Sequence, residues 1–354
     1  MTEPGASRSK SRLLEAAAVL AGAAIGAGLW YGHGREASAP AAVAAVTAMA
    51  QAVETGSSGV EKPAAAVAHP ATAPLLAAVQ AGSRIIAAGD HGVIVLSDDG
   101  GKTFRQARSV PTQAPLTSLS FVDPQQGWAA GHDGLILHTA DGGHTWKMQN
   151  FQPELNAPLF SVLAVDGQHA YAVGGFGTVK STEDGGEHWT DVTADSLSSD
   201  KLHLNAITRL ANGDLFIVGE HGLAATSHDG HDWHRLESPY EGSFFGTEPW
   251  GAQGAIAFGL RGNIYATADV HAVKWQKVDA GSISSLFGGA ATADGKAVLA
   301  GADGTLIAVN GSGAARKLSI TPTGQGQAGT YVSLVGSSGA LMVVGDGGIS
   351  KIVP

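Results

Sequence analysis

The chain has 354 residues, and its 50 glycines are about twice the usual share, while charged residues are only 15 %. A hydrophobic content of 44 % excludes disorder throughout, and the glycines follow no collagen period. A net charge of −10 without a long basic stretch argues against a nucleic-acid partner, and the absence of cysteine excludes disulfides and thiolate chemistry. Many short turns are the simplest use for so many glycines, which favours an all-β fold.

The N-terminal part predicts export. Residues 1–12 form a basic segment, and the apolar run 13–31 spans about 28 Å as a helix, about one hydrocarbon thickness. We expect 13–31 to be an uncleaved transmembrane anchor, with 1–12 in the cytoplasm and the rest on the periplasmic side of the inner membrane. A signal peptide cleaved after Ala37-Ser38-Ala39, leaving a periplasmic protein, and a buried soluble helix are the alternatives. Residues 32–61 are expected to be an Ala/Pro-rich linker.

From residue 74 onward one unit repeats: an apolar run, the motif G-x-x-G, a second apolar run and a polar turn. The spacings between successive copies are 42, 43, 45, 40, 42 and 44 residues, the length of a four-stranded propeller blade. Residues 62–354 are therefore predicted to be an all-β, seven-bladed β-propeller of four-stranded antiparallel blades. The first glycines of the seven motifs are Gly89, Gly131, Gly174, Gly219, Gly259, Gly301 and Gly345.

The second repeat predicts strands A to D at 116–122, 127–131, 135–139 and 145–149, with turns at 123–126 and 141–143. The last repeat stops after its third strand, whereas the first has all four. Ring closure is then expected to need an outer strand from elsewhere, and Lys62–His69 is the predicted donor.

The turn between strands C and D resembles the Asp-box of bacterial-neuraminidase-type repeats, S/T-x-D-x-G-x-T-W. Residues 139–146 (TADGGHTW) and 97–104 match, 181–189 match with one insertion, and 226–233 form a degenerate copy. The Asp carboxylate is expected to accept backbone N–H bonds and the aromatic residue to pack on the blade, with no catalytic role for Asp141 or its equivalents.

Together the elements GWAAG, GLILHT and DGGHTW, repeated seven times behind an export segment, resemble the photosystem II stability/assembly factor propellers and their non-photosynthetic bacterial relatives. The resemblance covers residues 74–354 and is strongest in the first three repeats. It implies an exported propeller without catalysis that assists assembly of a membrane-protein complex or accompanies a resistance-nodulation-division type transporter. Of the arginine patch of the photosynthetic members, only Arg261 has a counterpart here, so a photosystem II client is in doubt.

The central pairs of the G-x-x-G turns predict a ring of charge on one propeller face. We expect this ring to bind a partner protein, while a cation site or plain tolerance of Asp and His in turns are alternatives. The predicted partner-binding residues are Asp90, His91, His132, Asp133, Glu220, His221, Arg261, Asp303 and Asp346.

Other conspicuous side chains have structural explanations. His228, His231 and His234 should diverge on a turn and strand, and the tryptophans of the repeats should be core. The aromatic group Tyr240, Phe244, Phe245 and Trp250 is either core packing or a binding platform.

An enzyme remains the main competing class, because sialidases combine the Asp-box with a propeller. They need three convergent arginines, yet only Arg261 is placed toward the G-x-x-G turns, and no G-x-S-x-G elbow or phosphate loop occurs. We therefore predict no catalytic residue, no metal and no cofactor.

The sequence favours a monomeric, membrane-anchored scaffold for a membrane-protein complex or transporter subunit of the cell envelope. An Asp-box glycan-binding protein or sialidase-like glycoside hydrolase is the alternative, and a soluble periplasmic metal-binding propeller is the third possibility.

Overall fold

The structure is a computed structural model that describes residues 62–352, except 273, 292–295, 319–328 and 338–339. All described residues belong to one compact unit, Ser58–Pro354. The expected basic segment, anchor and linker, residues 1–61, lie outside the described residues. In the described part, no helix has the length and apolar character needed to cross a membrane.

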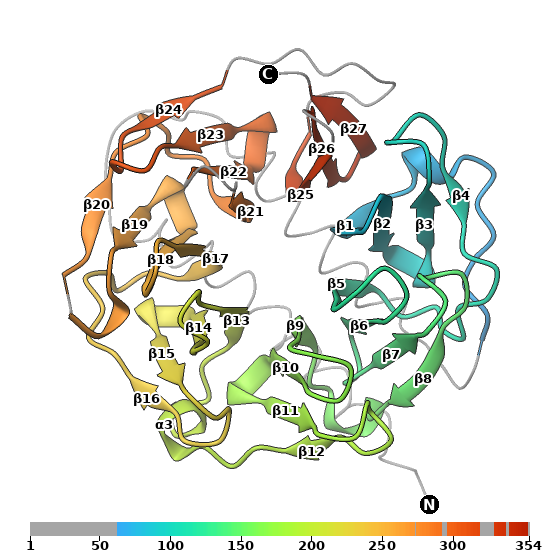
Figure 1. Cartoon of the computed structure of the whole chain (residues 1–354), viewed down its shortest axis with the longest axis horizontal. Coiled ribbons are helices and arrows are strands. Elements are labelled where there is room, and N and C mark those ends of the chain that lie inside the picture. Colours follow the sequence, from blue (N-terminus) through green and yellow to red (C-terminus); the bar gives the residue numbers. More distant parts are fainter. Residues whose placement is uncertain (1–61, 273, 292–295, 319–328, 338–339, 353–354) are drawn as a thin grey trace, which may run out of the picture. The chain divides into compact units, whose positions relative to one another are not determined.

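Seven antiparallel sheets surround a central axis as the blades of a propeller (Figure 1), as the repeat count predicts. The strands of each blade are given from the inner to the outer one. The first blade has β1 (Leu75–Ala81), β2 (Arg84–Gly89), β3 (Ile94–Ser97) and β4 (Arg105–Gln106), and the second has β5 (Leu116–Phe121), β6 (Gly127–Gly131), β7 (Ile136–Thr139) and β8 (Lys147–Asn150). The third blade has β9 (Leu159–Ala164), β10 (Ala170–Gly174), β11 (Val179–Thr182) and β12 (Thr190–Asp191), and the fourth has β13 (Leu204–Arg209), β14 (Leu215–Gly219), β15 (Ala224–Ser227) and β16 (His234–Arg235).

The other three sheets follow the same order around the ring. They are β17 (Phe244–Trp250), β18 (Gly254–Gly259), β19 (Ile264–Thr267) and β20 (Gln276–Val278); β21 (Leu286–Ala291), β22 (Ala297–Gly301), β23 (Leu306–Val309) and β24 (Ala315–Lys317); β25 (Tyr331–Ser337), β26 (Ala340–Gly345) and β27 (Gly348–Ile352).

Short helical segments lie in the connections. They are η1 (Pro70–Thr72), η2 (Asp90–Gly92), η3 (Pro153–Leu155), η4 (Gly175–Gly177), α3 (Asp195–Ser198), η5 (Glu220–Gly222), η6 (Leu260–Gly262), η7 (Val270–Ala272) and η8 (Ala302–Gly304). The strands predicted for the second repeat agree with β5–β8 to within two residues at each end.

The up-and-down order of each blade creates two chemically different ends. The turns between the second and third strands, which are the G-x-x-G turns, share one end with the connections between blades; we call it the G-x-x-G face. The other end carries the turns between strands one and two and the Asp turns between strands three and four; we call it the Asp-turn face. The turn in which a residue lies therefore determines on which of the two faces of the propeller it is found.

Adjacent blades share both apolar cores and hydrogen bonds. Leu96 and Ile86 of the first blade pack in one buried cluster with Leu116 and Trp146 of the second. Every inner strand has a register shift near its first residues, which leaves one residue outside the ladder. The extra residue of β5, Thr117, uses its hydroxyl to donate 2.6 Å to the Leu159 carbonyl of the next blade.

The prediction that Lys62–His69 completes the last blade is wrong. Among the described residues that blade has three strands, β25–β27. The segment instead bonds to the first blade: the Ala65 N–H donates 3.0 Å to the His91 carbonyl, and the Gln106 side-chain amide donates 2.7 Å to the Ala65 carbonyl. The last and first blades meet through their inner strands, where the Ala78 N–H donates 3.2 Å to the Ser333 hydroxyl.

The Asp turns hold the outer strands as the sequence predicts. In the second blade, Asp141 accepts the Thr145 N–H at 2.9 Å and the Thr145 hydroxyl at 2.7 Å, and the Gly143 N–H donates 2.9 Å to the Thr139 hydroxyl. The expected alignments of the third and fourth copies are corrected by one residue. Thr182 and Ser227 occupy the Thr139 position, so the third copy has no insertion.

Candidate functional site on the G-x-x-G face

The glycines of the G-x-x-G turns are required by close backbone approach. A Cβ on Gly89 would lie 2.2 Å from the carbonyl oxygen of Pro74, which precedes the inner strand. Gly92 has a φ of +70°, and a Cβ there would lie 2.0 Å from the Thr112 carbonyl in the connection to the next blade. In this turn the two glycines allow the backbone to pack closely against the connections on both sides. Packing therefore explains why they are glycines, without a role in ligand binding.

The residue before the second glycine is left-handed in six of the turns, with φ between 51° and 60°. Asp and His tolerate this region better than most residues, so turn geometry explains part of the charge that the sequence analysis assigned to a partner. Phe176 and Arg261 are the exceptions, because neither side chain favours this backbone. The six residues are His91, Asp133, Phe176, His221, Arg261 and Asp303.

The first two blades bring four of the predicted residues into one electrostatic group. Burial raises the pKa of Asp90, and the nearby His91 and His132 oppose this shift. Burial lowers the pKa of His132, and Asp133 and Asp90 oppose that shift. Burial also raises the pKa of Asp133, with His132 acting in the opposite direction. Two acids and two histidines thus form a half-buried polar patch across neighbouring turns.

The structure does not gather the remaining predicted residues around this patch. Glu220 accepts the His203 N–H at 2.8 Å, so it has a structural task at the start of β13. Asp303 accepts the Ser284 hydroxyl at 3.2 Å, while Arg261 and His221 are exposed in their own turns. Asp346 lies against Gly329 in the last blade.

No ion pair joins any of the predicted charged residues to another part of the described chain. Within residues 62–352 as described, no three His, Asp or Glu side chains are placed to hold a metal ion. Among the described residues, the predicted charged side chains of this face are therefore neither ion-paired nor grouped as metal ligands.

Exposed apolar side chains on this face were missed by the sequence analysis. The exposed large hydrophobic residues of the described chain are Leu155, Phe176 and Ile283, exposed by 56 %, 45 % and 88 %. Leu155 and Ile283 lie in connections between blades and Phe176 in a G-x-x-G turn, so all three belong to the G-x-x-G face. The available signal was the single Phe in a position that the other repeats fill with Asp, His, Arg or Gly.

Phe176 also caps an aromatic stack. Its ring meets His203 edge-on at 5.1 Å between centroids, and His203 lies 5.5 Å from Phe160 on the inner strand β9. The His203 side chain is buried, and its Nε2 atom has no hydrogen-bond partner. The contact with His203 supports the Phe176 side chain, whose backbone lies in the left-handed region that Phe does not favour.

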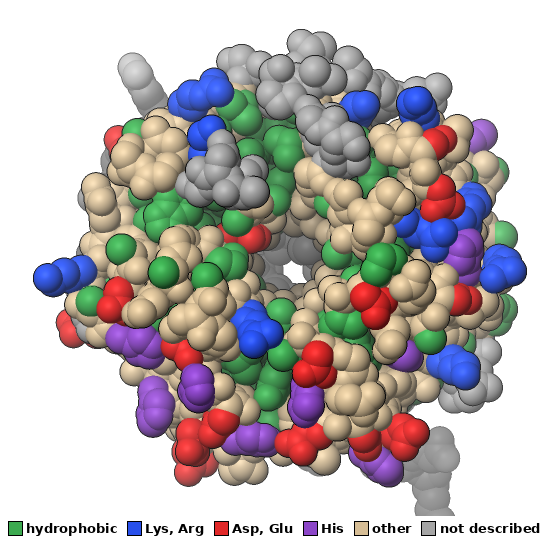
Figure 2. All heavy atoms as spheres, viewed as in Figure 1, with side chains coloured by type: hydrophobic (Ala, Val, Ile, Leu, Met, Phe, Trp, Pro, Cys, Tyr) green, Lys and Arg blue, Asp and Glu red, His purple; other side chains and the backbone are tan. Residues whose placement is uncertain are grey.

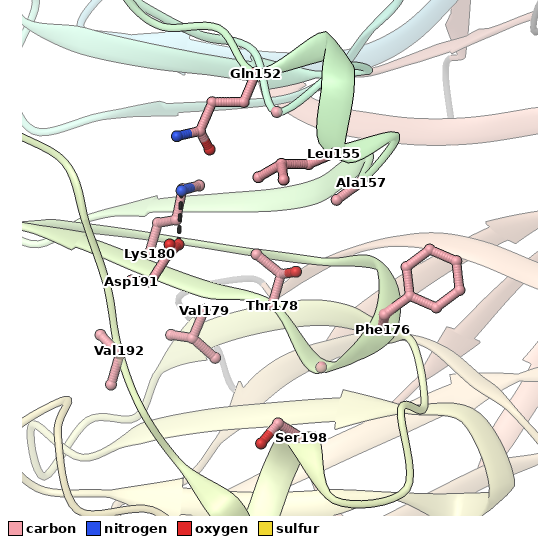
Figure 3. A pocket seen from close by; sticks show the side chains of 12 residues that line it. Gln152, Leu155, Ala157, Phe176, Thr178, Val179, Lys180, Asp191, Val192 and Ser198 are labelled. Carbon is pink, nitrogen blue, oxygen red and sulfur yellow. Dashed lines mark hydrogen bonds and ion pairs between the residues drawn. The ribbon is translucent and has the colours of Figure 1, made fainter.

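A cavity of about 240 Å³ opens beside Phe176, between the second and third blades. Figure 3 shows the Gln152 carboxamide and the Lys180 ammonium pointing into it from opposite sides. Lys180 is buried and donates 2.6 Å to Asp191. Leu155 and Phe176 stand at its edge.

Several charged groups of the Asp-turn face have partners within the fold. Histidines gather over β15 and β16 in Figure 2. His228 and His271 both contact Asp214, at 2.9 Å and 3.2 Å, whereas His231 lies 3.3 Å from Glu183. His228 and His231 diverge, as predicted. Lys and Arg side chains gather over β3 and β4, where Asp98 pairs with Arg84 and Arg105, each at 2.6 Å.

The aromatic group of the fourth connection is packing. Phe244 is buried, Tyr240 stacks 5.2 Å from it, and Phe245 stacks 5.5 Å from Phe287 of the next blade. Of the repeat tryptophans expected in the core, Trp128, Trp146 and Trp233 are buried, whereas Trp189 and Trp275 are half-buried.

Fold and site together define a seven-bladed β-propeller with a charged and partly apolar G-x-x-G face. The family model described as photosynthesis system II assembly factor YCF48 matches residues 154–348, more than half of the chain. The protein belongs to this family, as the repeat motifs led us to expect.

Solved structures show the same architecture. A structure described as YCF48 bound to D1 peptide has a TM-score of 0.63 and 17 % identity, covering 84 % of this chain and 98 % of that chain. YCF48 from Cyanidioschyzon merolae gives 0.61 and 16 %, covering 83 % and 98 %. The WD40 propeller domain of Doa1 gives 0.63 and 12 %, covering 83 % and 96 %. At these identities the likeness shows the fold.

One curated relative matches over a short stretch. The photosystem II stability/assembly factor HCF136, chloroplastic, of Cyanidioschyzon merolae (strain NIES-3377 / 10D) is 42 % identical over 45 residues. The stretch covers 12 % of this chain and 10 % of that protein, so it spans about a tenth of the relative's length.

Proposed function

We propose that the protein is a non-catalytic assembly factor that holds a polypeptide segment of a membrane-protein client on its G-x-x-G face. The observation that carries this proposal is the placement of Leu155, Phe176 and Ile283 on that one face. Covering exposed apolar residues with another protein is favourable, by about 25 cal/mol per Å² of buried apolar area.

Family membership supports the same class of function. One family structure is described as bound to a peptide of D1, so binding of a polypeptide segment has a precedent on this fold. The client proposed here is a membrane-protein complex or transporter subunit of the cell envelope. The unpaired acids of the face would then select a segment with complementary basic residues and speed its encounter.

The proposed location rests on the sequence alone. We propose that residues 13–31 anchor the chain in the inner membrane and that the propeller lies on the periplasmic side. Alkaline phosphatase fused after Pro354 is expected to be active in a bacterial host, because this enzyme needs export. An inactive fusion in a stably expressed protein would contradict this topology.

The client surface can be tested by photocrosslinking of the full-length protein in its native cells. A benzophenone amino acid at Ile283 is expected to capture one or a few membrane proteins, identified by mass spectrometry after mild-detergent extraction. The matched control carries the same group at Gln168, an exposed residue of the Asp-turn face. Equal capture from both positions, or capture only from Gln168, would contradict the proposal.

A further inference from the structure

The cavity between the second and third blades contains a polar group that the fold leaves unsatisfied. The Oε1 atom of Gln152 is buried and accepts no hydrogen bond. A buried acceptor without a donor is unfavourable, so a donor supplied from outside the fold would be bound favourably there. Gln152 is one of the residues that line the cavity, and a rotation of its carboxamide into that space would bring Oε1 within reach of an outside group.

The opposite wall supplies a donor. The Lys180 side chain is 3 % exposed, and Asp191 is the acceptor that the described residues give its ammonium. An ammonium has three N–H donors, so further donors remain. The pair with Asp191 leaves this wall close to neutral overall.

These two groups select the chemistry of an occupant. A carboxylate would bond Lys180 but would face the Gln152 oxygen and Asp191 without a proton to share. A cation would bond Gln152 but would be repelled by Lys180. A neutral amide satisfies both, because its N–H₂ donates to Gln152 and its carbonyl oxygen accepts from Lys180.

The edge of the cavity adds an apolar requirement. Leu155 and Phe176 are exposed there, and Phe176 is held by His203 in a left-handed backbone conformation. An aliphatic or aromatic side chain beside the amide would cover both residues. Polypeptides place such side chains next to amide side chains, whereas a sugar presents mainly hydroxyl groups to the same surface.

We propose that this cavity binds the side-chain amide of an Asn or Gln in a client polypeptide, with a neighbouring apolar residue packed on Phe176 and Leu155. The proposal rests on the proposed function, since it names where on the G-x-x-G face the client segment is read and by which group.

The test uses capped tripeptides with the full-length protein in mild detergent, observed by saturation-transfer NMR. The probes are Leu-Asn-Leu, Leu-Ala-Leu, Leu-Asp-Leu and Leu-Lys-Leu, together with N-acetylglucosamine. Leu-Asn-Leu is expected to bind at least fivefold more tightly than each of the others. Equal binding of Leu-Asn-Leu and Leu-Ala-Leu, or preferred binding of the sugar, would overturn the proposal.

Variants separate a binding role from a structural one. Gln152→Met is expected to weaken Leu-Asn-Leu binding about tenfold, which corresponds to one hydrogen bond, without lowering the melting temperature. Lys180→Met should weaken it similarly, and Gln168→Met on the opposite face is the matched control with unchanged binding. Unchanged binding in Gln152→Met, or a lowered melting temperature without loss of binding, would refute the assignment.

The two proposals fail in different ways. If crosslinking from Ile283 captures a client while Leu-Asn-Leu binds no better than Leu-Ala-Leu, the proposed function stands and the amide site is wrong. If Leu-Asn-Leu binds as expected but Ile283 captures no protein in cells, the cavity is an amide site and the client function is wrong.

Discussion

The two faces of the propeller use similar residues for different purposes. On the Asp-turn face, acids accept backbone N–H groups or pair with Arg and His, as Asp141 and Asp98 show. On the G-x-x-G face, Asp133 and Asp90 have no ion pair in the described chain, and the exposed large hydrophobic residues of the described chain belong to the same face. The difference teaches that acid content alone does not distinguish the faces, because many acids serve the fold; the proposed binding surface is the face whose acids lack ion-pair partners in the described chain.

The strongest test of this comparison replaces one Asp on each face of the same blade. Asp141→Ala removes the acceptor of the Thr145 N–H and of two hydroxyls, and we expect it to lower the free energy of unfolding by about 2–4 kcal/mol. Asp133→Asn keeps a residue that tolerates positive φ, and its cost should stay under about 0.5 kcal/mol. Denaturant unfolding measures both values, and similar losses would remove the distinction between the faces.

A carboxyl group that belongs to neither face gives the next largest effect. Glu248 on β17 lies against Gly289 of the next inner strand, and burial raises its pKa to about 7, although the Ala291 N–H opposes the shift. Below about pH 4.5 this group is neutral in the folded and unfolded chains. As the pH rises toward 7, the unfolded chain ionises first, so the folded protein loses stability, and the loss is complete above pH 7.

Glu248→Gln should therefore leave stability unchanged at pH 4 and raise it by about 1–3 kcal/mol at pH 8. Thermal unfolding followed at both pH values provides the measurement. A gain that is equal at pH 4 and pH 8 would mean that ionisation of Glu248 is not the cause.

A small stability effect is also expected at the exposed Phe of the G-x-x-G face. Phe176→Asn relieves an unfavourable left-handed backbone but loses the contact with His203, so the free energy of unfolding should change by less than about 1 kcal/mol. Client crosslinking from Ile283 should nevertheless fall at least fivefold. A large loss of stability with normal crosslinking would make Phe176 a packing residue and would weaken the contrast between the faces.

Local sequence patterns predicted most of the fold. Seven G-x-x-G motifs at 40–45 residue spacing predicted seven sheets, and the strands of the second repeat lie where apolar runs and turn residues placed them. The Asp turns were also predictable, because a carboxylate that accepts N–H groups two to four residues away is a local interaction. The error in the third copy, which begins at Thr182, shows that even this pattern leaves the register open by one residue.

Ring closure and the binding surface were decided by contacts between distant parts of the chain. Ala78 meets Ser333 across 255 positions, and Gln106 holds Ala65, so no pattern within either segment could show that Lys62–His69 joins the first blade. The charged pairs were found from the sequence, but their left-handed backbone and the structural task of Glu220 were not.

By itself, the sequence determined the number of blades, their strands and the residues of their turns, because each depends on hydrogen bonds and side-chain alternation within about 40 residues. Only the tertiary structure decided which polar groups remain without partners. Gln152 and Lys180 face one cavity because two blades pack side by side, and Phe176 is exposed because His203 of the following blade supports it. Whether a group is satisfied depends on all of its neighbours in space, and the packing of the blades around the ring sets those neighbours.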